Sequence, residues 1–129
     1  MKLYEVGDLG MLSMADRLSY VRSLASKYNL KESIQNSYGI KVYVYYLNSV
    51  CNSHILEWME ELDHVRMASE LRINRVDNVD NKEQLYAYEY KTEYSIRNIE
   101  RRLANYTKQA KEFMIKMKKQ EIENDFKST

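Results

Sequence analysis

The feature that most constrains the fold is a regular repeat of apolar residues in the C-terminal part of the chain. Steps of four and three residues alternate without exception through Thr92, Ile96, Ile99, Leu103, Tyr106, Ala110, Phe113 and Met117. This spacing places side chains on one stripe of an α-helix, as in the seam of a coiled coil. The chain has no proline that would break such a helix. We therefore predict a helix over about 81–124.

A similar repeat runs through the middle of the chain. Its members are Ile40, Val44, Leu47, Cys51, Ile55, Trp58, Leu62 and Val65. The spacing predicts one long helix over about 31–75. Residues 40–47 are also rich in β-branched and aromatic side chains, which favour a strand by local propensity. A strand over 40–47 is therefore the alternative.

The two repeats match when one is read in reverse. Pairing Leu62 with Ile96, and each following residue with its counterpart, keeps the sum of the two residue numbers nearly constant. An antiparallel hairpin has this property, and residues 77–81 between the repeats (Asp-Asn-Val-Asp-Asn) are typical of a turn. We predict that two long helices pair side by side with a turn near 78–79.

A shorter helix is expected before the hairpin. Ser13 followed by Asp16 is a helix-start signature, and apolar residues continue at helical spacing as far as Tyr28. The helix over about 13–28 has a one-sided apolar stripe, so it must pack against another element. The predicted fold is all-α: residues 1–129 form a single helical domain, a long coiled-coil-like antiparallel helical hairpin with the short N-terminal helix packed at its base.

Composition narrows the class of protein. Hydrophobic residues make up 44% of the chain and charged residues 30%, which indicates a globular protein, and the formal net charge is only +1. The single cysteine rules out an internal disulfide framework, and we find neither a signal peptide nor a membrane-spanning apolar run. We expect a soluble cytoplasmic protein. The bias toward Lys, Asn, Tyr and Ile is typical of AT-rich genomes, including those of phages and mobile elements.

No motif predicts catalysis. Glu61 and His64 have the Glu-x-x-His spacing of di-iron bundles, but His54 is the one other histidine. Cys51 and His54 are three residues apart, yet a cysteine in an apolar seam usually packs as a small hydrophobe. The glycines match no phosphate-binding spacing. We expect no enzyme activity, metal, cofactor, small-molecule substrate or membrane contact.

Two surfaces are candidates for binding. The first is a tyrosine stripe and its hairpin neighbours, which the first helix should leave uncovered near the hairpin tip. It comprises Met67, Leu71, Tyr86, Tyr90 and Tyr94. The second is a basic stripe within 97–119 that could bind nucleic acid. It comprises Arg97, Arg101, Arg102, Lys108, Lys111 and Lys116.

The tyrosine stripe carries the favoured functional prediction. We expect a small helical interaction protein that binds a protein partner or assembles with copies of itself. An assembly factor, a stoichiometric inhibitor or an adaptor encoded by a phage or mobile element would fit this size and composition. The alternative is a helical protein that binds nucleic acid through the basic stripe.

Overall fold

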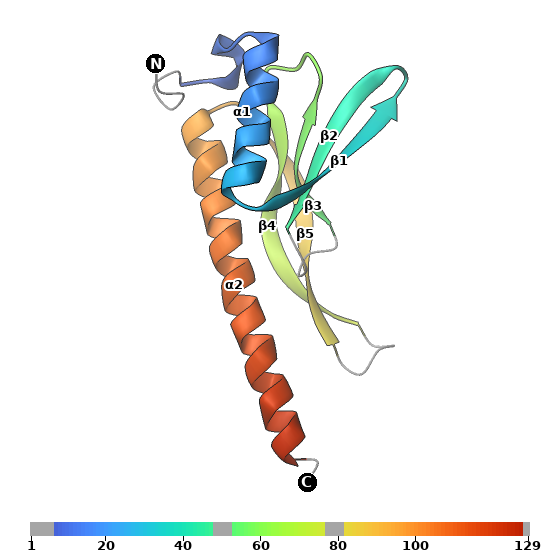
Figure 1. Cartoon of the computed structure of the whole chain (residues 1–129), viewed down its shortest axis with the longest axis vertical. Coiled ribbons are helices and arrows are strands. Elements are labelled where there is room, and N and C mark those ends of the chain that lie inside the picture. Colours follow the sequence, from blue (N-terminus) through green and yellow to red (C-terminus); the bar gives the residue numbers. More distant parts are fainter. Residues whose placement is uncertain (1–6, 48–52, 77–81, 128–129) are drawn as a thin grey trace.

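The structure is a computed structural model, and it describes residues 7–47, 53–76 and 82–127. It combines a five-stranded antiparallel sheet with two α-helices (Figure 1). The prediction of an all-α, coiled-coil-like helical hairpin is therefore wrong, and the class is mixed α and β. In chain order the elements are the 3₁₀ turn η2 (Leu9–Met11), α1 (Met14–Lys27), β1 (Leu30–Ser37), β2 (Ile40–Leu47), β3 (His54–Met59), β4 (Val65–Val76), β5 (Lys82–Glu93) and α2 (Ile96–Lys127).

The sheet is a simple meander in which each strand pairs with the next one in the chain. The alternative of a strand over 40–47 is confirmed, because β2 occupies these residues and pairs with both β1 and β3. The turn between β1 and β2 consists of Tyr38 and Gly39, which both have positive φ (52° and 81°). Two residues of this kind form the hairpin turn that matches the twist of a strand pair. The turn thus supports a β-hairpin at a point where one long helix was expected.

The chain reverses between β4 and β5, around the turn predicted near 78–79. That turn itself lies outside the described residues, but the strands on either side pair across it, for example Leu71 with Ala87. The constant sum of the predicted hairpin places Leu71 beside Tyr86 and Met67 beside Tyr90, one residue away from the observed register. In a sheet such a shift is decisive, because neighbouring residues point to opposite faces.

The first α-helix has nearly the predicted bounds, whereas the second begins later than predicted. A helix was expected over 13–28, and α1 covers Met14–Lys27, with the Ser13 hydroxyl accepting the backbone N–H of Asp16 at 3.2 Å. By contrast, α2 begins only at Ile96, because 82–93 is the strand β5. The buried side of α2 is the predicted stripe from Ile96 to Phe113. This stripe packs on a sheet instead of a second helix.

Both helices pack on the same face of the sheet (Figure 1). Side chains of α1 such as Leu24, of the sheet such as Tyr45 and Trp58, and of α2 such as Leu103 belong to one hydrophobic core. Hydrogen bonds from Leu9 N–H to the Tyr94 carbonyl and from Ile96 N–H to the Gly7 carbonyl join the N-terminal segment to the start of α2. Within the described ranges, neither helix combines the length and the apolar character needed to cross a membrane.

Candidate functional site

The candidate site lies on the face of the sheet opposite the two helices. Tyr86, Tyr88 and Tyr90 follow one another at steps of two along β5, so their side chains share one face of this strand. All three are partly exposed, and no helix in the described part of the chain packs on this face. Together with cationic and aromatic neighbours on β2, β3 and β4 they form what we call the open-face cluster. Its members are Tyr46, His54, Arg66, Arg72, Tyr86, Tyr88 and Tyr90.

Tyr90 and His54 form the centre of the open-face cluster. Tyr90 pairs with Ala68 across β4 and β5, and this small side chain leaves room for the tyrosine to extend toward β3. The rings of Tyr90 and His54 are stacked, with centroids 4.8 Å apart and planes inclined by 20°. The Tyr90 hydroxyl donates to the His54 carbonyl at 3.0 Å. The Tyr46 and His54 rings also make an edge-to-face contact, at a centroid distance of 6.0 Å. These contacts hold the three rings in place.

Two arginines of β4 order the neighbouring tyrosines. The Arg66 guanidinium carbon lies 5.6 Å from the centre of the Tyr90 ring, and that of Arg72 lies 3.2 Å from the centre of the Tyr88 ring. A guanidinium over an aromatic face is attracted by the negative potential of the ring. Arg72 also donates from Nε to a carboxylate oxygen of Glu70 at 2.9 Å.

Carboxylates offset much of the positive charge of the open-face cluster. Glu70 lies beside Arg72, and Glu57 Oε2 lies 3.2 Å from His54 Nε2. Arg66 remains as a cation at the edge of the aromatic group, without a salt bridge in the described ranges. The result is an aromatic surface of low net charge. Such a surface can bind by stacking and by burial of ring area.

The five residues predicted as an interface do not form one surface. Met67 is fully buried under the helices, and Leu71 is partly buried against the same core. Tyr86 and Tyr90 do lie on the open face. Tyr94 follows β5 and is 48% exposed, with its ring 5.2 Å from that of His64. Sequence reasoning missed Tyr88, although the step-of-two spacing of the three tyrosines was the signal that marks one face of a strand.

The six basic residues predicted on the C-terminal helix all lie on α2, with different surroundings. The Arg102 side chain is fixed by hydrogen bonds to the sheet. Its Nε donates to the Glu93 carboxylate at 2.9 Å, and its Nη1 donates to the Ser69 carbonyl at 3.4 Å. Lys116 pairs with Glu83 of β5 at 3.4 Å. The remaining four, Arg97, Arg101, Lys108 and Lys111, are exposed.

The motifs considered for metal or thiol chemistry do not assemble into a site. His64 Nδ1 lies 3.0 Å from Asp63, and this contact lowers the pKa of the aspartate. Glu61 lies in the turn after β3, with a positive φ of 80°. The described residues contain no group of three or more His, Cys, Asp or Glu side chains that could hold a metal ion. Cys51 lies outside the described residues, and so does its suggested pairing with His54.

Comparison with known proteins identifies no relative. No protein family, no curated protein and no solved structure matches this chain.

Proposed function

We propose that this protein acts by binding another protein through the open-face cluster, without catalysis. The observation that carries the proposal is the row of Tyr86, Tyr88 and Tyr90 on a sheet face that neither α1 nor α2 covers. Tyrosine and arginine are enriched at protein interfaces and among their hot-spot residues. The stacking of Arg72 on Tyr88 and of His54 on Tyr90 holds these rings before a partner arrives. Ordered side chains lose less entropy on binding.

Charge favours a protein over a nucleic acid as the partner of this face. A nucleic acid is held largely by cations that neutralise its phosphates. On the open face, however, Glu70 accompanies Arg72 and Glu57 accompanies His54. These carboxylates would repel phosphates, whereas they can accept hydrogen bonds from a protein surface. Nucleic-acid binding through the exposed cations of α2 is the alternative function.

The cellular role that fits this activity is that of an assembly factor, a stoichiometric inhibitor or an adaptor. The single cysteine supports a cytoplasmic location, because reducing compartments do not maintain disulfide frameworks. The composition fits a phage or mobile-element protein.

The proposal is tested with a Tyr86→Ala/Tyr88→Ala variant. Self-association of the purified protein is measured by sedimentation, and quantitative capture from a lysate of the producing cells compares partner binding between variants. We expect the double variant to keep its far-UV circular dichroism and to lose binding by at least about tenfold. Tyr94→Ala is the matched control, because it removes an exposed tyrosine that does not belong to the open-face cluster. A folded double variant that binds as the wild type does would refute the proposal. Loss of nucleic-acid binding in Lys108→Ala/Lys111→Ala alone would favour the alternative.

A further inference from the structure

α2 carries a second stripe of side chains on the side turned away from the sheet. It follows the same alternation of steps of four and three as the buried stripe and is displaced from it by five residues, about 140° around the helix. Every one of its members is exposed: Arg97, Arg101, Ala104, Lys108, Lys111, Ile115, Lys118 and Ile122. Ile115 and Ile122 expose 56% and 57% of their surface. Ala104, Ile115 and Ile122 thus place apolar side chains among the cations of this exposed stripe.

The upper end of this side of α2 already has a helical neighbour. α1 lies beside the first turns of α2 (Figure 1), where Lys27 Nζ pairs with Glu100 at 3.0 Å and the Tyr28 hydroxyl donates to the Glu100 carbonyl at 3.4 Å. α1 then ends, because Asn29 adopts a left-handed φ of 54° and the chain turns into β1. Further along α2, no other described element covers this side (Figure 1).

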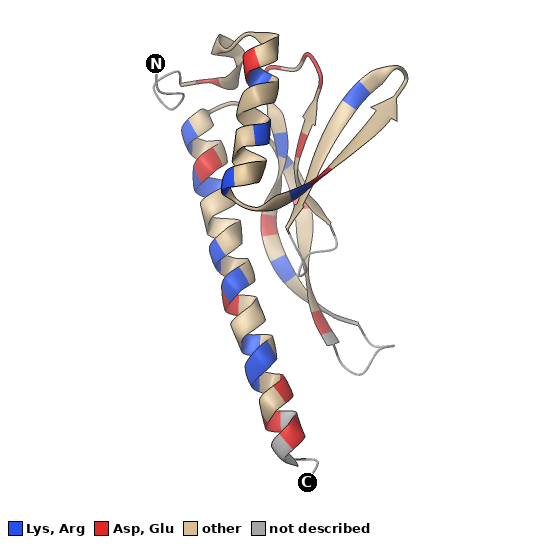
Figure 2. Ribbon diagram, viewed as in Figure 1, with Lys and Arg blue, Asp and Glu red and all other residues tan. Residues whose placement is uncertain are grey.

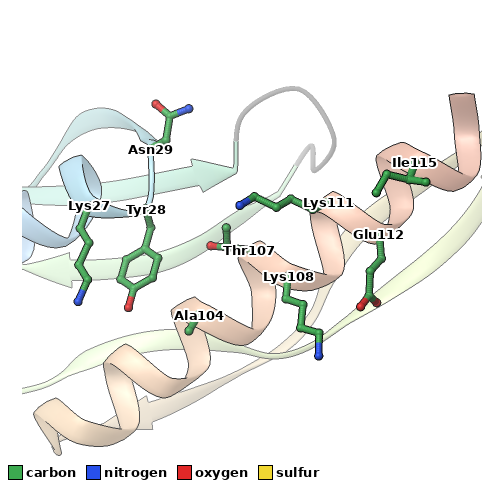
Figure 3. A pocket seen from close by; sticks show the side chains of 9 residues that line it. All are labelled: Lys27, Tyr28, Asn29, Ala104, Thr107, Lys108, Lys111, Glu112 and Ile115. Atoms are coloured by element: carbon green, nitrogen blue, oxygen red, sulfur yellow. The ribbon is translucent and has the colours of Figure 1, made fainter.

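A groove begins where α1 ends. Lys27, Tyr28 and Asn29 form one end of it and α2 forms its floor (Figure 3). The volume of this part is about 670 Å³, and Ala104, Thr107 and Ile115 line it with apolar groups. A second hollow of about 350 Å³ shares Glu112 and Ile115 with the first and continues to Glu123. From 104 to 123 the two together extend about 30 Å along the helix. We call them the α2 groove.

The α2 groove is predominantly basic. Lys108, Lys111 and Lys119 line it, and none of the three has a carboxylate partner within the described ranges. Lys27 and Lys116, by contrast, are paired with Glu100 and Glu83. Figure 2 shows basic residues through the middle of α2 and acidic residues near its C-terminal end. The carboxylates among the lining residues of the two hollows are Glu112 and Glu123, against five lysines. A ligand of complementary charge therefore carries negative charge on the part that faces residues 108–119.

We propose that the α2 groove binds an acidic amphipathic helix of a partner protein, which lies along α2 in line with α1. The length of the groove matches a helix of about 20 residues, and a small anion would fill only a fraction of it. Apolar side chains of the partner helix contact Ala104, Ile115 and Ile122, and its carboxylates pair with the free lysines. Helix-in-groove recognition uses this division between apolar anchors and flanking charges. The site is separate from the open-face cluster, on the opposite side of the sheet.

The direct test uses a fluorescent synthetic peptide of about 20 residues, with leucines at helical spacing and glutamates beside them. Binding to the full chain is measured by fluorescence anisotropy, and helix formation by circular dichroism. We expect saturable binding with a gain of helix. A scrambled peptide of the same composition has the same charge without the apolar stripe, and it should bind at least about tenfold more weakly.

Variants locate the site. Lys108→Glu/Lys111→Glu should weaken peptide binding by at least tenfold, and Ile115→Asp should weaken it as well. The matched control is Lys31→Glu/Lys41→Glu, which reverses two exposed lysines on β1 and β2 and should leave binding unchanged. The proposal is overturned if the acidic peptide does not bind, if the scrambled peptide binds equally well, or if both lysine pairs have the same effect. Salt-sensitive binding of a single-stranded oligonucleotide in place of the peptide would also overturn it and assign the groove to nucleic acid.

Discussion

Tyr20 and Tyr106, two of the buried tyrosines, differ in what their hydroxyl groups contact. Tyr106, on α2, donates its hydroxyl hydrogen to the Ala68 carbonyl of β4. Tyr20, on α1, is only 3% exposed, and its buried hydroxyl has no hydrogen-bond partner in the described structure. Burial raises the pKa of both phenols, so both stay neutral at physiological pH. A buried polar group without a partner costs free energy that a hydrogen-bonded one recovers.

This difference predicts opposite effects for the same chemical change. Tyr20→Phe should leave the free energy of unfolding unchanged or raise it by up to about 1 kcal/mol, because it removes an unpaired hydroxyl. Tyr106→Phe should lower it by about 1–2 kcal/mol, because the Ala68 carbonyl is left buried without its donor. Urea denaturation of both variants measures the difference. A Tyr20→Phe variant that loses as much stability as Tyr106→Phe would show that the Tyr20 hydroxyl has a partner.

At the scale of elements, the sequence pattern was informative where one face of a helix is buried. The stripe from Ile96 to Met117 identifies the buried side of α2, because an amphipathic helix on any apolar surface needs that spacing. The spacing along the helix does not indicate whether the surface beneath the buried stripe is a sheet or another helix. A sheet and a second helix both offer an apolar layer, so the stripe could not distinguish them.

The strands were misread because their patterns also satisfy helical spacing. In β2 both faces are buried: Tyr43 and Tyr45 face the helices, while Val42 and Val44 lie on the other face. A strand buried on both sides is a continuous apolar run without alternation. From such a run, residues at steps of three and four can always be selected. In β5, Tyr86 and Tyr90 are two strand periods apart, a step that equals one turn of a helix.

The same ambiguity between helical and strand spacing affected the prediction of the candidate site. Tyr86 and Tyr90 were identified as surface residues because a step of four residues keeps two side chains on one side of a helix and also on one face of a strand. Met67 and Leu71 were assigned to the same surface through a helical register, and the sheet places them on its helix-covered face instead. His54 and Arg72 join the open-face cluster through pairing between strands, which no spacing along the chain reveals.

The length of α2 leads to a prediction about which of its turns the fold needs. Among the residues of α2 whose burial the structure describes, Phe113 is the last buried one, and Met117 is partly buried against the core. Deleting residues 121–129 should therefore change the free energy of unfolding by less than about 0.5 kcal/mol, as for surface changes in general. Phe113→Ala should lower it by about 3 kcal/mol, because it leaves a cavity between α2 and the sheet. Thermal and urea denaturation measure both. A large loss on deletion would show that the end of α2 packs on something essential to the fold.

At the scale of the whole molecule, a single core joins elements that are far apart in the chain. Trp58 of β3 is 1% exposed and packs on Tyr43 at a ring distance of 5.6 Å, and its indole N–H donates to the Leu62 carbonyl at 2.9 Å. Leu24 of α1 and Leu103 of α2 belong to the same core. Because neither helix has another apolar surface to pack on within the described ranges, removing the sheet would expose the buried sides of both.

This shared core predicts cooperative unfolding. Trp58 fluorescence reports on the core, and circular dichroism at 222 nm reports mainly on α1 and α2. Both signals should give the same urea midpoint and the same slope, as expected for a small two-state domain. Residues 118, 119 and 121–123 of α2 are exposed. This part of the helix should fray before the transition and add a gradual slope to the dichroism signal alone. A helix signal that melts in a separate, later transition would show that α2 is stable without the sheet, and would refute the single-core description.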